Sequence, residues 1–183
     1  MSDVVDLIMS DHREVERLFD VLKNDPSTRA LNLPVLTALL TAHSRAEEAE
    51  VYPAAAEAGG AEDVEHGQKE HLEADQLLAR LAETDPDAPE FESRLQDLVD
   101  AISHHVEEEE TTVLPAMRER MSQDELRDLA ERFSQVRANL LGEQPDDITR
   151  EQLVQQAQNL DLDAASGRSK AELAAELKDQ AEL

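Results

Sequence analysis

The segment HSRAEEAEVYP at residues 43–53 is followed, 62 residues further on, by HVEEEETTVLP at residues 105–115. Both segments begin with a histidine, carry a glutamate four residues later and end with a proline. Around each histidine, apolar residues recur at intervals of three and four, which is the period of a helix with one buried face. The two segments therefore predict two amphipathic helices of the same design.

A second repeat lies on the stretches that precede these two segments. An apolar seam runs through residues 5–22, and a shift of 59 residues places it on residues 64–81, with His12 matching His71. The chain thus contains two matching helix pairs, and these helices are expected at residues 4–23, 36–57, 61–82 and 91–121. Matching pairs of this kind predict an all-α fold, an up-down four-helix bundle with a pseudo-twofold internal repeat.

Six ionisable side chains occupy these apolar seams and are therefore expected in the core: His12, His43, Glu47, His71, His105 and Glu109. Burying such groups without partners costs several kcal/mol each, and no Lys or Arg lies on the seams. A His and a Glu four residues apart stand on one helix face, about 6 Å apart, and can bind one centre. The set suits two metal ions, each with two histidines, bridged by both glutamates. Mixed imidazole and carboxylate ligation favours iron, with manganese as the alternative.

These two segments, together with Asp11-His12 and Glu70-His71, resemble the hemerythrin-like HHE cation-binding family over about residues 3–120. The resemblance implies a four-helix bundle with a bridged, non-haem di-iron centre that binds dioxygen, nitric oxide or peroxide. Oxygen carriage, nitric oxide handling and catalase-like removal of peroxide would use the same ligands. The sequence therefore leaves a carrier and an enzyme both open.

Hemerythrins carry a further histidine one turn before the ligand of the third helix, and His66 is the residue nearest to that position. Its spacing to His71 is five residues, roughly 140° around an ideal helix, so ligation would need a π-bulge or another distortion. As a fifth histidine ligand, His66 would saturate one iron, whereas as a surface or supporting residue it would leave both irons open. His104 competes with His105 for the fourth-helix position, and the 62-residue repeat favours His105.

Tyr52 corresponds to Leu114 in the repeat, which leaves two interpretations of its role. It is either an apolar cap beyond the metal, or a phenol that donates a proton to the centre or ligates it.

The residues after the bundle predict a fifth helix and a separate module. Ser122 and Glu125 form a capping box that opens a helix to about Leu141, packed on the bundle. The expected division is a bundle with its fifth helix at 1–141, a linker at 142–147 and a helical hairpin at 148–183. The hairpin resembles small modules of the SAP and Rho N-terminal type, some of which bind nucleic acid. Its acidic residues outnumber its basic ones, so a module that docks to a protein partner, or a simple tail, is favoured over nucleic-acid binding.

Two other classes of function remain besides the di-iron carrier or enzyme. In an iron or redox sensor, the bundle would loosen without metal and signal through the C-terminal module. In the other class, the chain would be a metal-free structural bundle.

Composition limits the remaining classes of protein. Charged residues make up 33% of the chain and only five glycines are present, which favours helices over sheets. The chain has no cysteine, so disulfides and thiolate ligands are excluded. A formal net charge of −26 argues against nucleic acid, whose phosphates require Lys and Arg. Without a signal peptide or an apolar run of about 20 residues, a cytoplasmic protein without membrane contact is expected.

Overall fold

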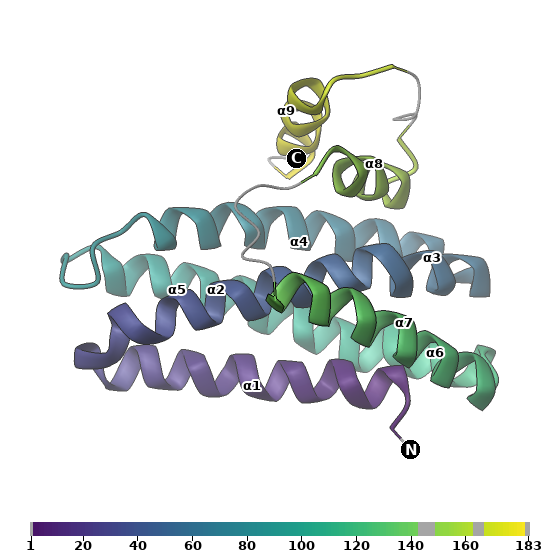
Figure 1. The fold of residues 1–183 in the computed structure, drawn as a ribbon, viewed down its shortest axis with the longest axis horizontal. Coiled ribbons are helices and arrows are strands. Elements are labelled where there is room, and N and C mark those ends of the chain that lie inside the picture. Colours follow the sequence, from purple (N-terminus) through teal and green to yellow (C-terminus); the bar gives the residue numbers. More distant parts are fainter. Residues whose placement is uncertain (1, 143–148, 163–166, 182–183) are drawn as a thin grey trace.

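The computed structural model describes residues 2–142, 149–162 and 167–181 (Figure 1). Within these residues it contains helices and no strand, so the predicted all-α class is confirmed. The helices are α1 (Val4–Asn24), α2 (Arg29–Ala46), α3 (Tyr52–Ala55), α4 (Ala61–Ala82), α5 (Phe91–Glu108), α6 (Leu114–Arg120), α7 (Gln123–Gly142), α8 (Arg150–Asn159) and α9 (Lys170–Ala181). None of the described helices is both long and apolar enough to cross a membrane.

The bundle consists of four long helices, α1, α2, α4 and α5, which alternate in direction along the long axis of the molecule (Figure 1). Helix α1 packs against α2 and α5, and α4 packs against the same two neighbours, which gives the predicted up-down arrangement. Helix α7 lies across α1 and α2 as the predicted fifth helix. The hairpin of α8 and α9 rests on α4, on the side that faces away from α1 (Figure 1).

The internal repeat is preserved in the backbone as well as in the sequence. A π-helical turn follows α2 at Glu47–Val51 (η2), and another follows α5 at Glu109–Val113 (η4). Each turn begins at the repeated glutamate and is followed by a short helix with a proline in its first turn. A proline lacks the backbone N–H and crowds the carbonyl four residues earlier, which a wider turn accommodates. Since π-bulges occur frequently at functional sites, both turns mark the glutamates as functional candidates.

The second helix begins at Arg29 rather than near residue 36, and Pro34 therefore falls inside it. Arg29 is buried, donates from Nε to the carbonyl oxygen of Leu22 at 3.0 Å and stacks over the ring of Phe91 at 4.7 Å. These tertiary contacts hold the first turn of α2 in place against the local effect of the proline.

The core of the bundle consists of two apolar clusters with a polar layer between them. One cluster includes Val15 and Phe91, and the other includes Ile8 and Phe133. Along α1, His12 lies between Ile8 and Val15 and is buried with them. The polar layer therefore lies near the middle of the bundle, where apolar residues shield it from water on both sides.

The C-terminal hairpin has a small apolar cluster of its own. Leucines of α8 and α9, among them Leu153 and Leu173, pack together around Leu72 of α4. A capping box opens α8, with Thr149 and Gln152 bonded reciprocally. Of the linker expected at 142–147, residues 143–147 lie outside the described residues.

Candidate metal centre

Six ionisable side chains converge in the polar layer of the bundle. Each of the four long helices supplies one histidine, and η2 and η4 each supply the glutamate with which they begin. The six residues, all at most 5% exposed, are His12, His43, Glu47, His71, His105 and Glu109. The structure thus brings together the six positions to which the sequence repeat points.

The cluster divides into two pairs of histidines with Glu47 between them. The ring centroids of His12 and His43 are 5.1 Å apart, and those of His71 and His105 are 4.7 Å apart. Oε2 of Glu47 lies 3.2 Å from Nε2 of His43 and 3.4 Å from Nε2 of His71. One carboxylate therefore faces both pairs.

Several polar atoms of the cluster are buried without a hydrogen bond among the described residues. They are Nε2 of His12, Nε2 of His43, and both carboxylate oxygens of Glu47 and of Glu109. Oε2 of Glu109 lies 3.2 Å from Nε2 of His12, an ion-pair contact. Buried charges are normally paired or bound to metal, and imidazole and carboxylate donors suit divalent transition metals. The residues present therefore fit a cation centre.

A carboxylate stands behind each of the four histidines, on the side away from the centre. The distances from Nδ1 to the carboxylate oxygen are 2.9 Å for His12 and Glu110, 3.3 Å for His43 and Asp11, 3.4 Å for His71 and Glu48, and 2.8 Å for His105 and Glu70. The pairing follows the pseudo-twofold repeat. Each carboxylate contacts a histidine on another helix. Such a partner holds the proton on Nδ1 and turns Nε2 toward a metal.

Two of these outer carboxylates are held by elements outside the four long helices. Arg137 of α7 binds both oxygens of Asp11, at 2.6 and 2.7 Å. Gln156 of α8 donates to Oε1 of Glu48 at 3.2 Å, and Asn159 donates to its backbone carbonyl oxygen at 3.1 Å. Sequence reasoning missed these contacts, because an apolar stripe such as that of α7 shows the buried face of a helix but not which polar residue at its edge meets which carboxylate.

The charges of the cluster are coupled through short distances and burial. Burial lowers the pKa of His43, but the carboxylates of Glu47 and Asp11 outweigh it and raise that pKa to about 10. Burial also opposes the charge of His71, whose pKa Glu47 and Glu48 nevertheless raise to about 9. The imidazoles in turn hold the pKa of Glu47 well below its usual range, although burial alone would raise it. Without a metal, protons take the place of the cation between these groups.

Tyr52 lies beside the centre and reaches it through a gap left by a glycine. Its Oη is 3.0 Å from Nε2 of His71, and burial together with the nearby carboxylates raises the pKa of the phenol well above 10. A Cβ atom on Gly67 would lie only 2.9 Å from that oxygen. In the repeat Gly67 corresponds to Ile8, so a glycine at an otherwise apolar seam position was the signal in the sequence for this close approach.

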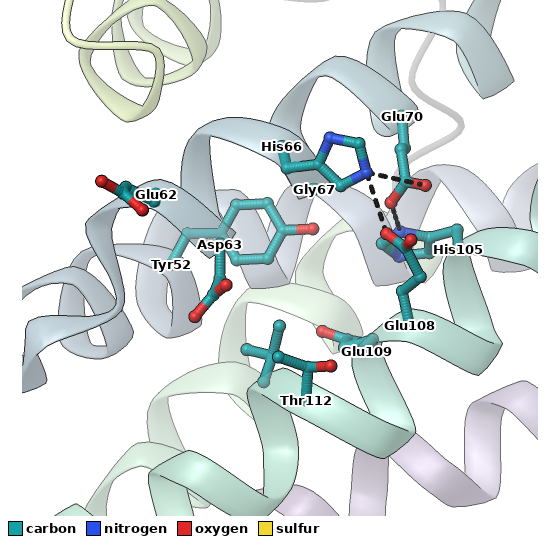
Figure 2. A pocket seen from close by; sticks show the side chains of 11 residues that line it. Tyr52, Glu62, Asp63, His66, Gly67, Glu70, His105, Glu108, Glu109 and Thr112 are labelled. Carbon is teal, nitrogen blue, oxygen red and sulfur yellow. Dashed lines mark hydrogen bonds and ion pairs between the residues drawn. The ribbon is translucent and has the colours of Figure 1, made fainter.

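The structure does not bring His66 to the six buried residues. Helix α4 is regular across residues 66–71, so a spacing of five residues turns His66 away from His71. The His66 side chain is 58% exposed, and its Nε2 lies 2.8 Å from Glu108 rather than near the centre (Figure 2). His104 is 64% exposed on the same outer side, whereas its neighbour His105 points inward.

A pocket of about 280 Å³ leads from this surface toward the centre (Figure 2). His66 and Glu108 line its outer part, while Tyr52, His105 and Glu109 line its inner part. A second cavity of only about 10 Å³ lies on the other side of the histidines, among Leu40, Ile102 and other apolar side chains.

The bundle and its buried cluster of histidines and glutamates define a helical metal-binding protein, in which facing helices supply the ligands. The chain belongs to the hemerythrin HHE cation-binding domain family, whose model matches residues 3–117.

Two curated proteins are similar to the chain. A DNA nickase from Nostoc sp. (strain PCC 7120) is 31% identical over 140 residues, which cover 75% of this chain and 40% of that protein. An uncharacterised hemerythrin-like protein from Schizosaccharomyces pombe is 27% identical over 144 residues, which cover 75% of this chain and 70% of that protein. The chain thus spans less than half of the nickase. No solved structure matches the chain.

Proposed function

We propose that the protein holds two iron ions in the buried cluster and uses them to bind or turn over dioxygen, nitric oxide or hydrogen peroxide. His12 and His43 would bind one ion, His71 and His105 the other, and Glu47 and Glu109 would bridge them. The observation that carries the proposal is the pair of buried carboxylates without hydrogen bonds between two pairs of histidines. Iron held in this way supplies a redox-active Lewis acid with open positions for a small ligand.

The surroundings of the cluster support a small ligand. The pocket that leads inward is lined by the hydroxyl-bearing Tyr52, which remains protonated and can donate a hydrogen bond. Beyond the histidines the second cavity has room for about one water-sized molecule. His66 faces outward, so the arrangement favours four histidine ligands and an open position on both ions.

Iron content, measured by elemental analysis of freshly purified protein together with its visible spectrum, tests this proposal. We expect about two irons per chain, with oxo-bridge absorption in the near ultraviolet, and loss of both signals in His43→Ala and Glu47→Gln. Glu107→Gln, on the exposed side of α5, is the matched control and should keep them. No metal, or one zinc per chain, would refute the di-iron proposal.

Addition of peroxide separates a carrier from an enzyme. Steady consumption of peroxide with evolution of gas indicates catalase-like turnover. A lasting change in the spectrum without gas indicates a carrier or a sensor.

An iron or redox sensor is the second candidate, favoured by the contacts of α8 with Glu48. Glu48 faces His71 on one side and accepts a hydrogen bond from Gln156 on the other, so a loss of metal can reach the C-terminal hairpin directly. When the hairpin is released, the face that packs on the bundle becomes available for a protein partner to bind.

Hydrogen exchange in α8, measured with and without iron, tests the sensor. We expect the amides of α8 to exchange faster without iron than with it. This difference in rate should be smaller in Asn159→Ala than in the control Gln158→Ala, whose side chain is exposed. Equal exchange in both states would refute the sensor.

The name of the Nostoc relative raises the question of whether this chain also nicks DNA. The charge of the chain argues against that activity. A net charge of −26 repels the DNA backbone. We expect no relaxation of supercoiled plasmid by the iron-loaded protein at moderate salt, and nicking that disappears in Glu47→Gln would contradict this expectation.

A further inference from the structure

A second group of histidines and glutamates lies on the surface, above the pocket. His66 and Glu70 on α4 and His104 and Glu108 on α5 are each four residues apart, the same spacing as His43 and Glu47. One ligand atom from each of the four lies within 4.8 Å of all the others. Nε2 of His66 is 2.8 Å from Glu108 and 3.6 Å from Glu70, and Nε2 of His104 is 3.5 and 3.7 Å from the same two carboxylates.

The chemistry of this surface cluster suits a cation. Two imidazoles and two carboxylates, held on two packed helices, form the donor set of many divalent transition-metal sites. Oε1 of Glu70 is buried, has no hydrogen bond and is aimed between the two imidazoles. The pocket beside the cluster is lined by five carboxylates and by no Lys or Arg, so its potential attracts cations.

Glu70 connects this surface cluster to the buried centre. Its Oε1 faces the two outer histidines, while its Oε2 lies 2.8 Å from Nδ1 of His105, one of the six buried residues. The pocket runs past both groups, since His66 and Glu108 line its mouth and His105 and Glu109 its floor (Figure 2). A metal ion at the surface cluster would therefore stand at the opening of the path to the centre.

We propose that His66, Glu70, His104 and Glu108 form a second, surface site for a divalent transition-metal ion, which captures the ion and delivers it through the pocket to the buried centre. Binding at this site is independent of the proposed di-iron function, whereas the delivery role rests on it. The outward direction of His66, which removes it from the buried centre, is the feature that makes this site possible.

Titration of the metal-free protein with Co²⁺, followed by visible absorption and by equilibrium dialysis, tests the binding. We expect wild-type protein to bind one equivalent more than the double variant His66→Ala with His104→Ala. Both side chains are more than half exposed, so the double variant should fold. The control Glu62→Gln with Asp63→Asn removes charge from the same pocket without removing a cluster residue, and it should keep the additional equivalent.

The outcomes separate the two proposals. Equal numbers of equivalents in wild type and double variant would overturn the surface site. A single equivalent in wild type that disappears in the double variant would support the surface site and refute the buried centre.

The rate at which Fe²⁺ fills the buried centre, followed by stopped-flow absorption, tests delivery. We expect about a tenfold slower filling in the double variant, with the same final content of buried iron. An unchanged rate would overturn the delivery role.

Discussion

Replacement of Glu109 by leucine should stabilise the metal-free protein and weaken the metal-bound one. Both carboxylate oxygens of Glu109 are buried without a hydrogen bond, and the residue is 2% exposed. Its ion-pair contact with Nε2 of His12 does not supply a hydrogen bond. A buried polar group without a hydrogen bond costs about 1–3 kcal/mol, and a leucine of similar length removes that cost. For a chain of this size the gain corresponds to a rise in melting temperature of about 2–12 °C. The partner at Nε2, His12, can become neutral and keep its contact with Glu110.

Thermal unfolding with and without iron, followed by circular dichroism, measures this effect. Wild-type protein should gain stability when iron is added, because the ion binds only the folded chain. Without iron, Glu109→Leu should have a higher melting temperature than wild-type protein, and the addition of iron should raise it little. Glu107→Leu, on the exposed side of the adjoining helix α5, should change the metal-free melting temperature hardly at all. A large loss of stability in metal-free Glu109→Leu would refute the reasoning that this carboxylate is present for a ligand rather than for the fold.

Other residues of the buried cluster and its surroundings can be tested in the same way. Gly67→Ala should displace the Tyr52 hydroxyl. Since Tyr52 is the only tyrosine in a chain without tryptophan, the intrinsic fluorescence of the protein should change. An unchanged fluorescence spectrum would contradict the close approach of Tyr52 to Gly67. Metal binding should release protons and become tighter as the pH rises from 6 to 9, because the pKa values of His43 and His71 are raised in the metal-free state. Calorimetry in two buffers counts the released protons, and the absence of any release would contradict this prediction. Burial alone would raise the pKa of Glu48, but the charges of Arg45 and His71 lower it from 4.5 to about 2. Glu48 should therefore stabilise the folded protein above pH 4.5 and lose this contribution as the pH falls to 2, a dependence that Glu48→Gln should flatten in acid unfolding.

The bundle and the six buried positions could be predicted from the sequence because both depend on local periodicity. A histidine on an apolar seam is carried inward with the seam, whatever the detailed packing. The repeat then supplied the pairing of helices. His43 and His105, for example, occupy equivalent positions, and the structure buries both.

The partners behind the histidines depend on how far one helix is rotated and shifted against the next. The sequence shows that Asp11 and Glu70 are equivalent, but not that each turns toward a histidine of the neighbouring helix. Arg137 is separated from Asp11 by 126 residues, and no local pattern links the two. The early start of α2 has the same cause, because the tertiary contacts of Arg29 decide it.

The spacing of His66 shows where sequence reasoning left two possibilities open. A ligand role required a distorted helix. The described residues have π-helical turns at Glu47–Val51, Ala56–Gly60 and Glu109–Val113, and all three lie outside α4. A regular α4 therefore places His66 on the surface, where it meets residues of α5.

A crystal structure of the iron-loaded protein, with anomalous scattering recorded at the iron edge, would test the central proposal most directly. We expect two strong peaks within about 4 Å of each other in the polar layer, one beside His12 and His43 and the other beside His71 and His105. A single peak there, or none in crystals shown to contain iron, would contradict a di-iron centre built from these residues.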